Sequence, residues 1–220
     1  MKNVFLIGDS IRFGASANPD YQTANSPGYG IYVEKMLDGI ANVYMPNDNC
    51  RFAQYTLRYL YDWTKDIDCE KIDVVHWNNG LWDVCELFGD GAFTPKEEYV
   101  ETMLRIARLL KERASIVIFA TTTPVRPDNS HNRNEVIEEY NEALVPRLME
   151  MGVVINDLYT PISKDLYKFI SDDKIHLSEE GILLASDMVE SVIRREAEKL
   201  GDAKKNKEET HENATLGAPV

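Results

Sequence analysis

Three side chains of this chain have the residue types and the spacing to support nucleophilic catalysis. Ser10 follows the apolar run Val4–Ile7, which is typical of a buried strand and ends at a glycine and a carboxylate. Because ligands of open α/β sheets bind at the carboxyl ends of the strands, a hydroxyl there is a candidate nucleophile if the chain supplies a base. Asp173 and His176 supply one, since their spacing in a loop before a helix lets the carboxylate bond one imidazole nitrogen while the other faces the cleft.

Each of these features also has an ordinary structural explanation. Gly-Asp-Ser is common in turns, and Asp-x-x-His is common where a helix begins. Asp172 is the second choice for the carboxylate, and His131, on a polar loop at the same edge of the predicted sheet, is the competing base. The other histidines are poorer candidates, since His76 lies inside a predicted strand and His211 lies in the predicted tail. Whether these residues are catalytic therefore depends on whether the predicted strands and helices bring them together.

The elements that must position these residues alternate along the chain. Apolar and β-branched runs predict strands near residues 4–8, 41–45, 72–77, 115–120 and 153–155. Helical periodicity lies between them, and this alternation predicts an α/β fold with a five-stranded parallel sheet between helices. One domain is expected over residues 1–200. Residues 201–220 lack large apolar side chains and are predicted to form a disordered tail.

The composition narrows the class of partner. The chain has 220 residues and a formal net charge of −13, which opposes binding to nucleic-acid phosphate or to an anionic membrane surface and favours a neutral substrate. No apolar run approaches the roughly 18 residues that span a bilayer, and no signal-peptide pattern precedes the first strand, so a cytoplasmic location is expected. The cysteines, Cys50, Cys69 and Cys85, lack the spacing of a metal site, and no metal or other cofactor is expected.

The order of the motifs resembles that of the SGNH hydrolases, also called the GDSL esterase/lipase family. Gly8-Asp9-Ser10 lies near the amino end, an Asn-Gly pair follows the third strand, and Asp173-x-x-His176 lies near the carboxyl end. The resemblance covers about residues 3–198 and implies a flavodoxin-like three-layer α/β/α sandwich. It implies acyl transfer with Ser10 as nucleophile, His176 as base and Asp173 as the residue that orients the imidazole. It also implies an oxyanion hole formed by the Ser10 N–H, a second-block backbone N–H and a third-block asparagine side chain.

The second block departs from the family's usual pattern, because Arg51 and Gln54 stand where glycines are common. A backbone N–H group needs no glycine unless φ is positive, so Gln54, or its neighbour Ala53, is predicted to donate to the oxyanion. Arg51 and Arg12 lie on loops predicted to border the nucleophile. They are candidates to bind a substrate carboxylate or sugar hydroxyls, or to pair with acidic residues nearby.

The third block departs as well, because Trp82 stands at the position of the oxyanion asparagine. Asn79, just past the strand, is predicted to aim its amide at the cleft instead. Asn78 is the alternative donor and a candidate substrate-binding residue. Trp82 is predicted to line the substrate pocket, whereas Trp77 is predicted to belong to the core.

These observations predict a serine ester hydrolase that removes short acyl groups, such as acetyl, from a carbohydrate or small-molecule ester. A short acyl group is favoured because no long apolar stretch suggests a lid or a lipid channel. A lysophospholipase or acyl-thioesterase is an alternative, and so is a non-catalytic carbohydrate-binding module, which the altered oxyanion blocks suggest. A phosphate-binding module is disfavoured because the loop after the first strand lacks a phosphate cradle.

Overall fold

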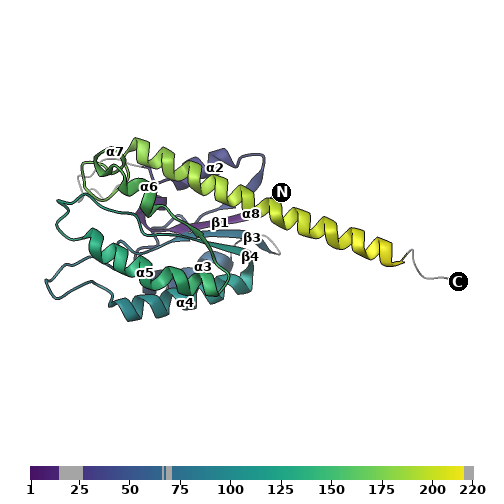
Figure 1. Cartoon of the computed structure of the whole chain (residues 1–220), viewed down its shortest axis with the longest axis horizontal. Coiled ribbons are helices and arrows are strands. Elements are labelled where there is room, and N and C mark those ends of the chain that lie inside the picture. Colours follow the sequence, from purple (N-terminus) through teal and green to yellow (C-terminus); the bar gives the residue numbers. More distant parts are fainter. Residues whose placement is uncertain (15–26, 66, 68–70, 216–220) are drawn as a thin grey trace.

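The computed structural model describes residues 1–14, 27–65, 67 and 71–215, with side chains described as far as Gly201 (Figure 1). A five-stranded parallel sheet runs through its centre in the order β2-β1-β3-β4-β5. The strands are β1 (Lys2–Gly8), β2 (Ala41–Tyr44), β3 (Ile72–Asn78), β4 (Ala114–Ala120) and β5 (Val154–Asn156). This strand order is that of the flavodoxin-like doubly wound folds, so the predicted fold class is confirmed.

Helices cover both faces of the sheet. They are α1 (Ser10–Phe13), α2 (Gly30–Met36), α3 (Ala53–Lys65), α4 (Lys96–Arg113), α5 (Asn134–Glu150), α6 (Tyr159–Ser163), α7 (Leu166–Phe169) and α8 (Glu179–Thr215). On one face α2 packs against α8, and on the other α3, α4 and α5 pack side by side (Figure 1). Parallel strands need such crossovers, because the chain must return to the same end of the sheet before each new strand.

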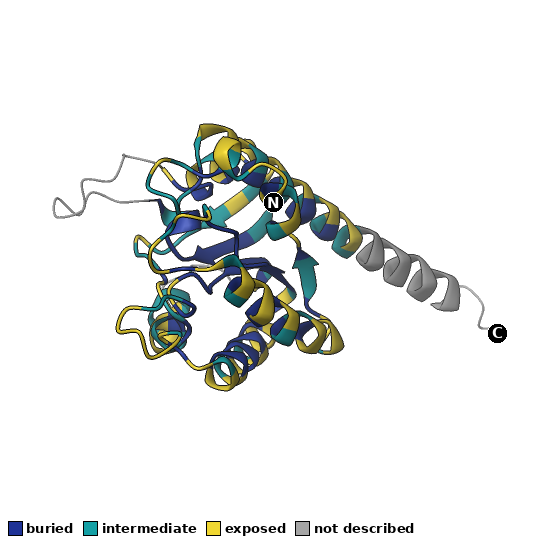
Figure 2. Cartoon of the chain, turned by 60° about the vertical axis from the view of Figure 1, so that its left-hand side comes forward, coloured by how far each residue is buried: buried dark blue, intermediate teal, exposed yellow. Residues whose placement is uncertain are grey.

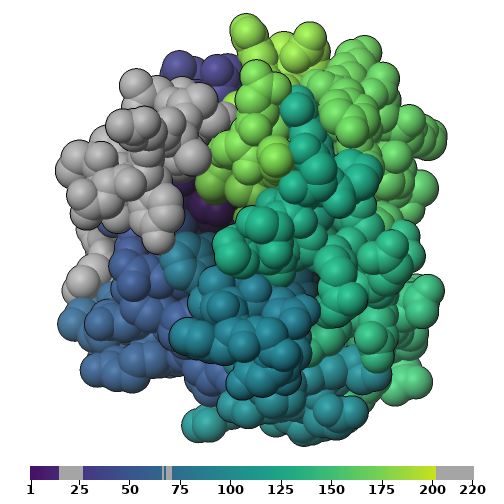
Figure 3. All heavy atoms as spheres, turned by 90° about the vertical axis from the view of Figure 1, so that its left-hand side faces the viewer, coloured from purple at the N-terminus to yellow at the C-terminus, as the bar shows by residue number. Residues whose placement is uncertain are grey.

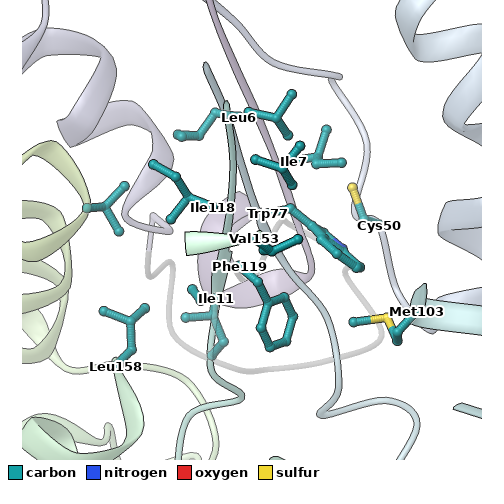
Figure 4. Close-up of a cluster of buried hydrophobic side chains, with 14 of the residues drawn as sticks. Leu6, Ile7, Ile11, Cys50, Trp77, Met103, Ile118, Phe119, Val153 and Leu158 are labelled. Atoms are coloured by element: carbon teal, nitrogen blue, oxygen red, sulfur yellow. The ribbon is translucent and has the colours of Figure 1, made fainter. Parts of the chain in front are cut away.

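The core lies on both sides of the sheet. All four side chains of Val4–Ile7 are fully buried, as a strand covered on both faces requires (Figure 2). The Trp77 indole, predicted to be core, is also fully buried. It meets the Phe119 ring edge to face, with ring centroids 5.0 Å apart (Figure 4). The apolar run before Ser10 is therefore fixed by packing on both faces.

The ends of two helices depend on more than the local sequence pattern. The residues Thr94-Pro95-Lys96-Glu97 have the pattern of a capped helix start, yet Pro95 is the N-cap of α4 and the Thr94 hydroxyl donates to Asp83 instead. Helix α8 continues to Thr215, through much of the segment predicted to be a disordered tail. Lys, Glu and Ala are frequent there, and extending an existing helix needs no new nucleus.

The helices in the described ranges are all too short or too polar to cross a lipid bilayer.

We expect Leu6→Ala to lower the free energy of unfolding by about 2–5 kcal/mol, because it opens a cavity in a packed core. Leu6 is fully buried in β1, whereas Leu183 on α8 is 50% exposed. Leu183→Ala makes the same chemical change at the surface and is expected to cost much less. Chemical denaturation of both variants checks this, and equal losses would contradict the buried placement of β1.

Candidate active site

The candidate site lies at the carboxyl edge of the sheet. In the β1–β3 register Gly8 pairs with Asn78, so the residues that follow β1 lie beside the end of β3. Asp9 is the N-cap of α1, and its Oδ1 accepts a hydrogen bond from the Ile11 N–H at 3.0 Å. Ser10 is the first residue of α1, so its N–H group has no acceptor within the helix. Figure 3 looks onto this edge, where amino-terminal atoms, in purple, lie at the bottom of a hollow rimmed by later segments.

Asp173 and His176 form the predicted carboxylate–imidazole pair. Oδ2 of Asp173 lies 2.7 Å from Nδ1 of His176, and its Oδ1 accepts the backbone N–H groups of Ile175 and His176 at 3.0 and 2.9 Å. Partial burial opposes ionisation, but the bonds from the His176 ring, these N–H groups and the Ser171 hydroxyl outweigh it and hold the pKa of Asp173 well below its usual range. A carboxylate only accepts, so Nδ1 carries the proton and Nε2 is left as the basic nitrogen.

His176 lies at the same end of the sheet as Ser10. Burial raises the pKa of Asp9 to about 6, against the bonds from Ile11 and Asn78 and the charges of His176 and Arg12. The loop that carries His176 is also bonded to the segment after β4, since the Arg126 N–H donates to the Lys174 carbonyl at 3.0 Å, and parallel strands end at the same edge of the sheet. The structure thus brings the candidate nucleophile and the candidate base to one edge.

The competing residues are engaged elsewhere. Asp172 is exposed and forms an ion pair with Arg126 at 3.1 Å. His131 is exposed, with Nδ1 at 3.2 Å from a backbone carbonyl oxygen. His76 is fully buried, burial lowers its pKa to about 3, and its Nε2 accepts from Asn156 Nδ2 at 3.1 Å. Of His211 only the backbone, in α8, is described.

Asn78 orients Asp9. Its Nδ2 donates to Asp9 Oδ1 at 2.8 Å, and its Oδ1 accepts from the Tyr29 hydroxyl at 2.8 Å. Asn78, predicted as a possible substrate-binding residue, therefore lies in the site, but its amide nitrogen is bonded to Asp9 and its amide oxygen to Tyr29. Tyr29 could not be found from the sequence, because a single tyrosine at the end of a polar loop belongs to no motif that would mark it as part of a site.

The Asn79 amide is bonded to groups of the protein itself. Asn79 is fully buried, and its Nδ2 donates to the Arg51 carbonyl at 2.7 Å. Its Oδ1 accepts from Trp77 Nε1 at 2.7 Å and from Thr56 Oγ1 at 3.0 Å. These contacts hold the turn at Arg51, whose φ is +48°. They do not support the predicted role of Asn79 as an oxyanion donor.

The start of α3 is held by Asp83. Both carboxylate oxygens accept from the Ala53 N–H at 3.1 Å, and Thr94 Oγ1 donates to Oδ1 at 2.8 Å. Burial raises the pKa of Asp83 to about 7, although both of these partners favour the ionised form. Because the Ala53 N–H is occupied, the Gln54 N–H, in the first turn, is the second-block backbone donor left for an oxyanion. Asp83 and Thr94 were missed, since their roles depend on contacts distant in sequence.

The predicted substrate-binding side chains divide into exposed and buried ones. Trp82 is 43% exposed. Arg51 is exposed, with its guanidinium carbon 4.7 Å from the centroid of the Tyr55 ring. Arg12 is only 3% exposed and donates to the Asp48 backbone carbonyl. A substrate in the cleft therefore has access to Trp82 and Arg51 far more readily than to Arg12.

Among the described residues, no group of three or more His, Cys, Asp or Glu side chains is arranged to hold a metal ion.

No family model matches the chain, and no curated protein matches it in sequence. Solved structures do match it. A member of the lipolytic G-D-S-L family from Veillonella parvula is 17% identical with a TM-score of 0.69, over 89% of this chain and 100% of that one. A lipase/acylhydrolase from Enterococcus faecalis is 18% identical with a TM-score of 0.67, over 88% and 95% of the two chains. The chain has the fold of the GDSL, or SGNH, hydrolases.

The SGNH fold confirms the resemblance that the order of the motifs indicates. An acetylxylan esterase from Geobacillus stearothermophilus shares it at 18% identity and a TM-score of 0.61, over 89% of this chain and 94% of that one. At such low identity, the likeness shows that the fold is shared and nothing more. The roles of individual residues therefore rest on the contacts described above.

We expect Asp173→Asn to lower kcat for ester hydrolysis by roughly 10⁴-fold, because an amide no longer fixes the Nδ1–H tautomer or stabilises the imidazolium. Asparagine keeps one oxygen to accept the backbone N–H groups, so the loop should still fold. Asp172→Asn is the matched control, and steady-state kinetics should show no change because Asp172 is exposed and turned to Arg126. Equal effects of the two substitutions would contradict the assignment.

Proposed function

We propose that this protein is a serine ester hydrolase that works through an acyl-enzyme. The observation that carries the proposal is the Asp173–His176 pair at 2.7 Å, with an ionised carboxylate, at the sheet edge where Ser10 begins α1. A strand-end serine and a carboxylate-oriented imidazole are the parts that acyl transfer requires. The SGNH fold, shared with proteins named as esterases and lipases, adds independent support.

The chemistry follows from these roles. Nε2 of His176 takes the proton of the Ser10 hydroxyl as Oγ attacks the ester carbonyl carbon, and Asp173 stabilises the imidazolium that forms. The tetrahedral intermediate collapses, the C–O bond to the alcohol breaks, and His176 returns the proton to the leaving oxygen. In the second half, water gives a proton to His176 and attacks the acyl carbon. The bond from that carbon to Ser10 Oγ then breaks, His176 returns the proton to Ser10 Oγ, and the acid leaves.

We assign the oxyanion to two backbone donors. The Ser10 N–H and the Gln54 N–H each lie in the first turn of a helix, where backbone donors have no partner in the helix and the helix dipole favours negative charge. Asn79, bonded to Arg51, is not part of this proposal. Each preorganised donor of this kind contributes on the order of 10²-fold or more to kcat.

The proposed substrate is a short acyl ester of a carbohydrate. Two structural neighbours are named acetyl xylan or acetylxylan esterases. At the rim of the site, the exposed Trp82 indole and the Arg51 guanidinium offer a flat apolar face and a hydrogen-bond donor. A sugar presents the matching combination of an apolar face and hydroxyl groups. The neighbour named a lipase/acylhydrolase keeps a longer acyl chain as the alternative.

Ser10→Ala is expected to lower kcat toward p-nitrophenyl acetate by on the order of 10⁶-fold, to below detection. It should also abolish labelling by a fluorophosphonate, which reacts with activated serines. Ser163→Ala, an exposed serine in α6, is the control and should keep both properties. A fully active Ser10→Ala variant would refute the nucleophile, whereas a wild type that binds glycans without labelling would favour the non-catalytic module.

The acyl preference gives a separate prediction. We expect kcat/KM to be higher for p-nitrophenyl acetate than for p-nitrophenyl decanoate, and acetylated xylo-oligosaccharides to release acetate. The measurement is initial rates with both esters, together with acetate detection. A preference for decanoate would favour the lysophospholipase or thioesterase alternative while leaving the serine mechanism intact.

A further inference from the structure

Arg12, two residues after the candidate nucleophile, is a buried cation bonded to backbone carbonyls. One guanidinium nitrogen donates to the Asp48 carbonyl at 2.6 Å and to the Gly8 carbonyl at 3.3 Å. The other terminal nitrogen donates to the Pro46 carbonyl at 3.2 Å, and Cys50 Sγ lies 3.8 Å from the first. Arg12 therefore joins the end of β1 to the loop over residues 46–50.

Glycines make room for this residue. A Cβ atom at Gly8 would lie 2.8 Å from Arg12 Cβ, and one at Gly30 would lie 2.9 Å from Arg12 Cδ. A Cβ atom at Gly28 would lie 2.1 Å from the Arg12 carbonyl oxygen. Atoms do not approach so closely without a bond. Gly30 therefore leaves room for the arginine side chain, whereas Gly8 and Gly28 let the neighbouring segments pack directly on the backbone and Cβ of residue 12.

The charge of Arg12 has no contacting counter-ion in the described part of the chain. Its hydrogen bonds there end on carbonyl oxygens and one sulfur, and its buried Nε has no partner. Burying a cation whose hydrogen bonds to the described residues end on neutral groups costs folding free energy, and an apolar side chain of similar length would avoid that cost. Stability alone therefore gives a poor account of an arginine here.

The two segments that Arg12 joins carry the two proposed oxyanion donors. The end of β1 leads to Ser10, and the loop over 46–50 leads into the first turn of α3 at Gln54. Gly8 and Cys50 tie the same segments further. The Cys50 N–H donates to the Gly8 carbonyl at 3.0 Å, and the Gly8 N–H donates to Cys50 Sγ at 3.2 Å.

We propose that Arg12 is a positioning residue for the oxyanion hole. Its guanidinium fixes the separation between the Ser10 N–H and the Gln54 N–H, and its positive charge favours the negative charge that develops between them. Arg12 does this from beneath the site and does not touch the substrate. The inference rests on the proposed serine esterase mechanism. It differs from both roles predicted for Arg12 from the sequence, which were substrate binding and pairing with acidic neighbours.

The test compares Arg12→Met, Arg12→Lys and, as control, Arg58→Met on the exposed side of α3. We expect Arg12→Met to lower kcat toward p-nitrophenyl acetate about 100-fold with KM unchanged, since misplaced donors affect the transition state and not substrate binding. Affinity for a trifluoromethyl ketone, which forms an anionic tetrahedral adduct with the serine, should fall by the same factor. Arg12→Lys, which keeps the charge but not the planar fork, should lie between, and Arg58→Met should match the wild type.

Thermal unfolding of each variant establishes that it is folded, and hydrogen exchange over residues 46–56 should be faster in Arg12→Met. A folded Arg12→Met with wild-type kcat would overturn the proposal. So would a raised KM at unchanged kcat, which would indicate substrate binding. If Arg12→Met does not fold, the same comparisons on Arg12→Lys decide. A wild type that neither hydrolyses the ester nor reacts with a fluorophosphonate would instead refute the esterase mechanism itself.

Discussion

The parallel pairing of β1 with β3 is the constraint on which the rest of the site depends. Gly8 lies opposite Asn78, and a Cβ atom on Gly8 would lie 1.9 Å from Asn78 Oδ1, so the two strand ends approach as closely as a glycine permits. The Asn78 amide then reaches Asp9 and fixes the turn into α1. A register slip of one residue would turn these side chains to the opposite face of the sheet. The position of Ser10 is thus set by strands buried in the core. The loops contribute further side chains around this position.

Buried charges are concentrated around this edge. Burial raises the pKa of Asp9 to about 6 and that of Asp83 to about 7, and Arg12 lies between backbone carbonyls nearby. A carboxyl group whose pKa is raised on folding favours the folded state below its unfolded pKa near 4, and this contribution is lost as the pH rises toward the folded value. At neutral pH these groups therefore cost stability. Because these groups lie at the edge that carries the candidate site, we infer that they are retained for the electrostatic field and the backbone geometry of the site, although they lower stability.

The parts of the site that could be predicted from the sequence are those formed by residues close together in the chain. Asp173 and His176 lie three residues apart before a helix, and the spacing alone indicates their hydrogen bond, which the structure contains at 2.7 Å. The strands were found from their apolar runs, and the fold class followed from their alternation. Asn79 could not be assigned from sequence, because its amide direction is decided by an Arg51 carbonyl that another element supplies. The burial of Arg12 could not be found from sequence either, since it depends on the loop over residues 46–50 and on Gly30 of α2.

The packing of α8 has a consequence for the order in which the protein becomes active during synthesis. Four of the five strands lie between Ser10 and His176 in the sequence, and α8, which begins three residues after His176, packs against α2 and β3. A ribosome therefore releases the strand that leads to the nucleophile well before the loop that carries the base. A nascent chain that has not yet docked α8 has no imidazole beside its serine, so the proposed chemistry begins only when the domain is complete.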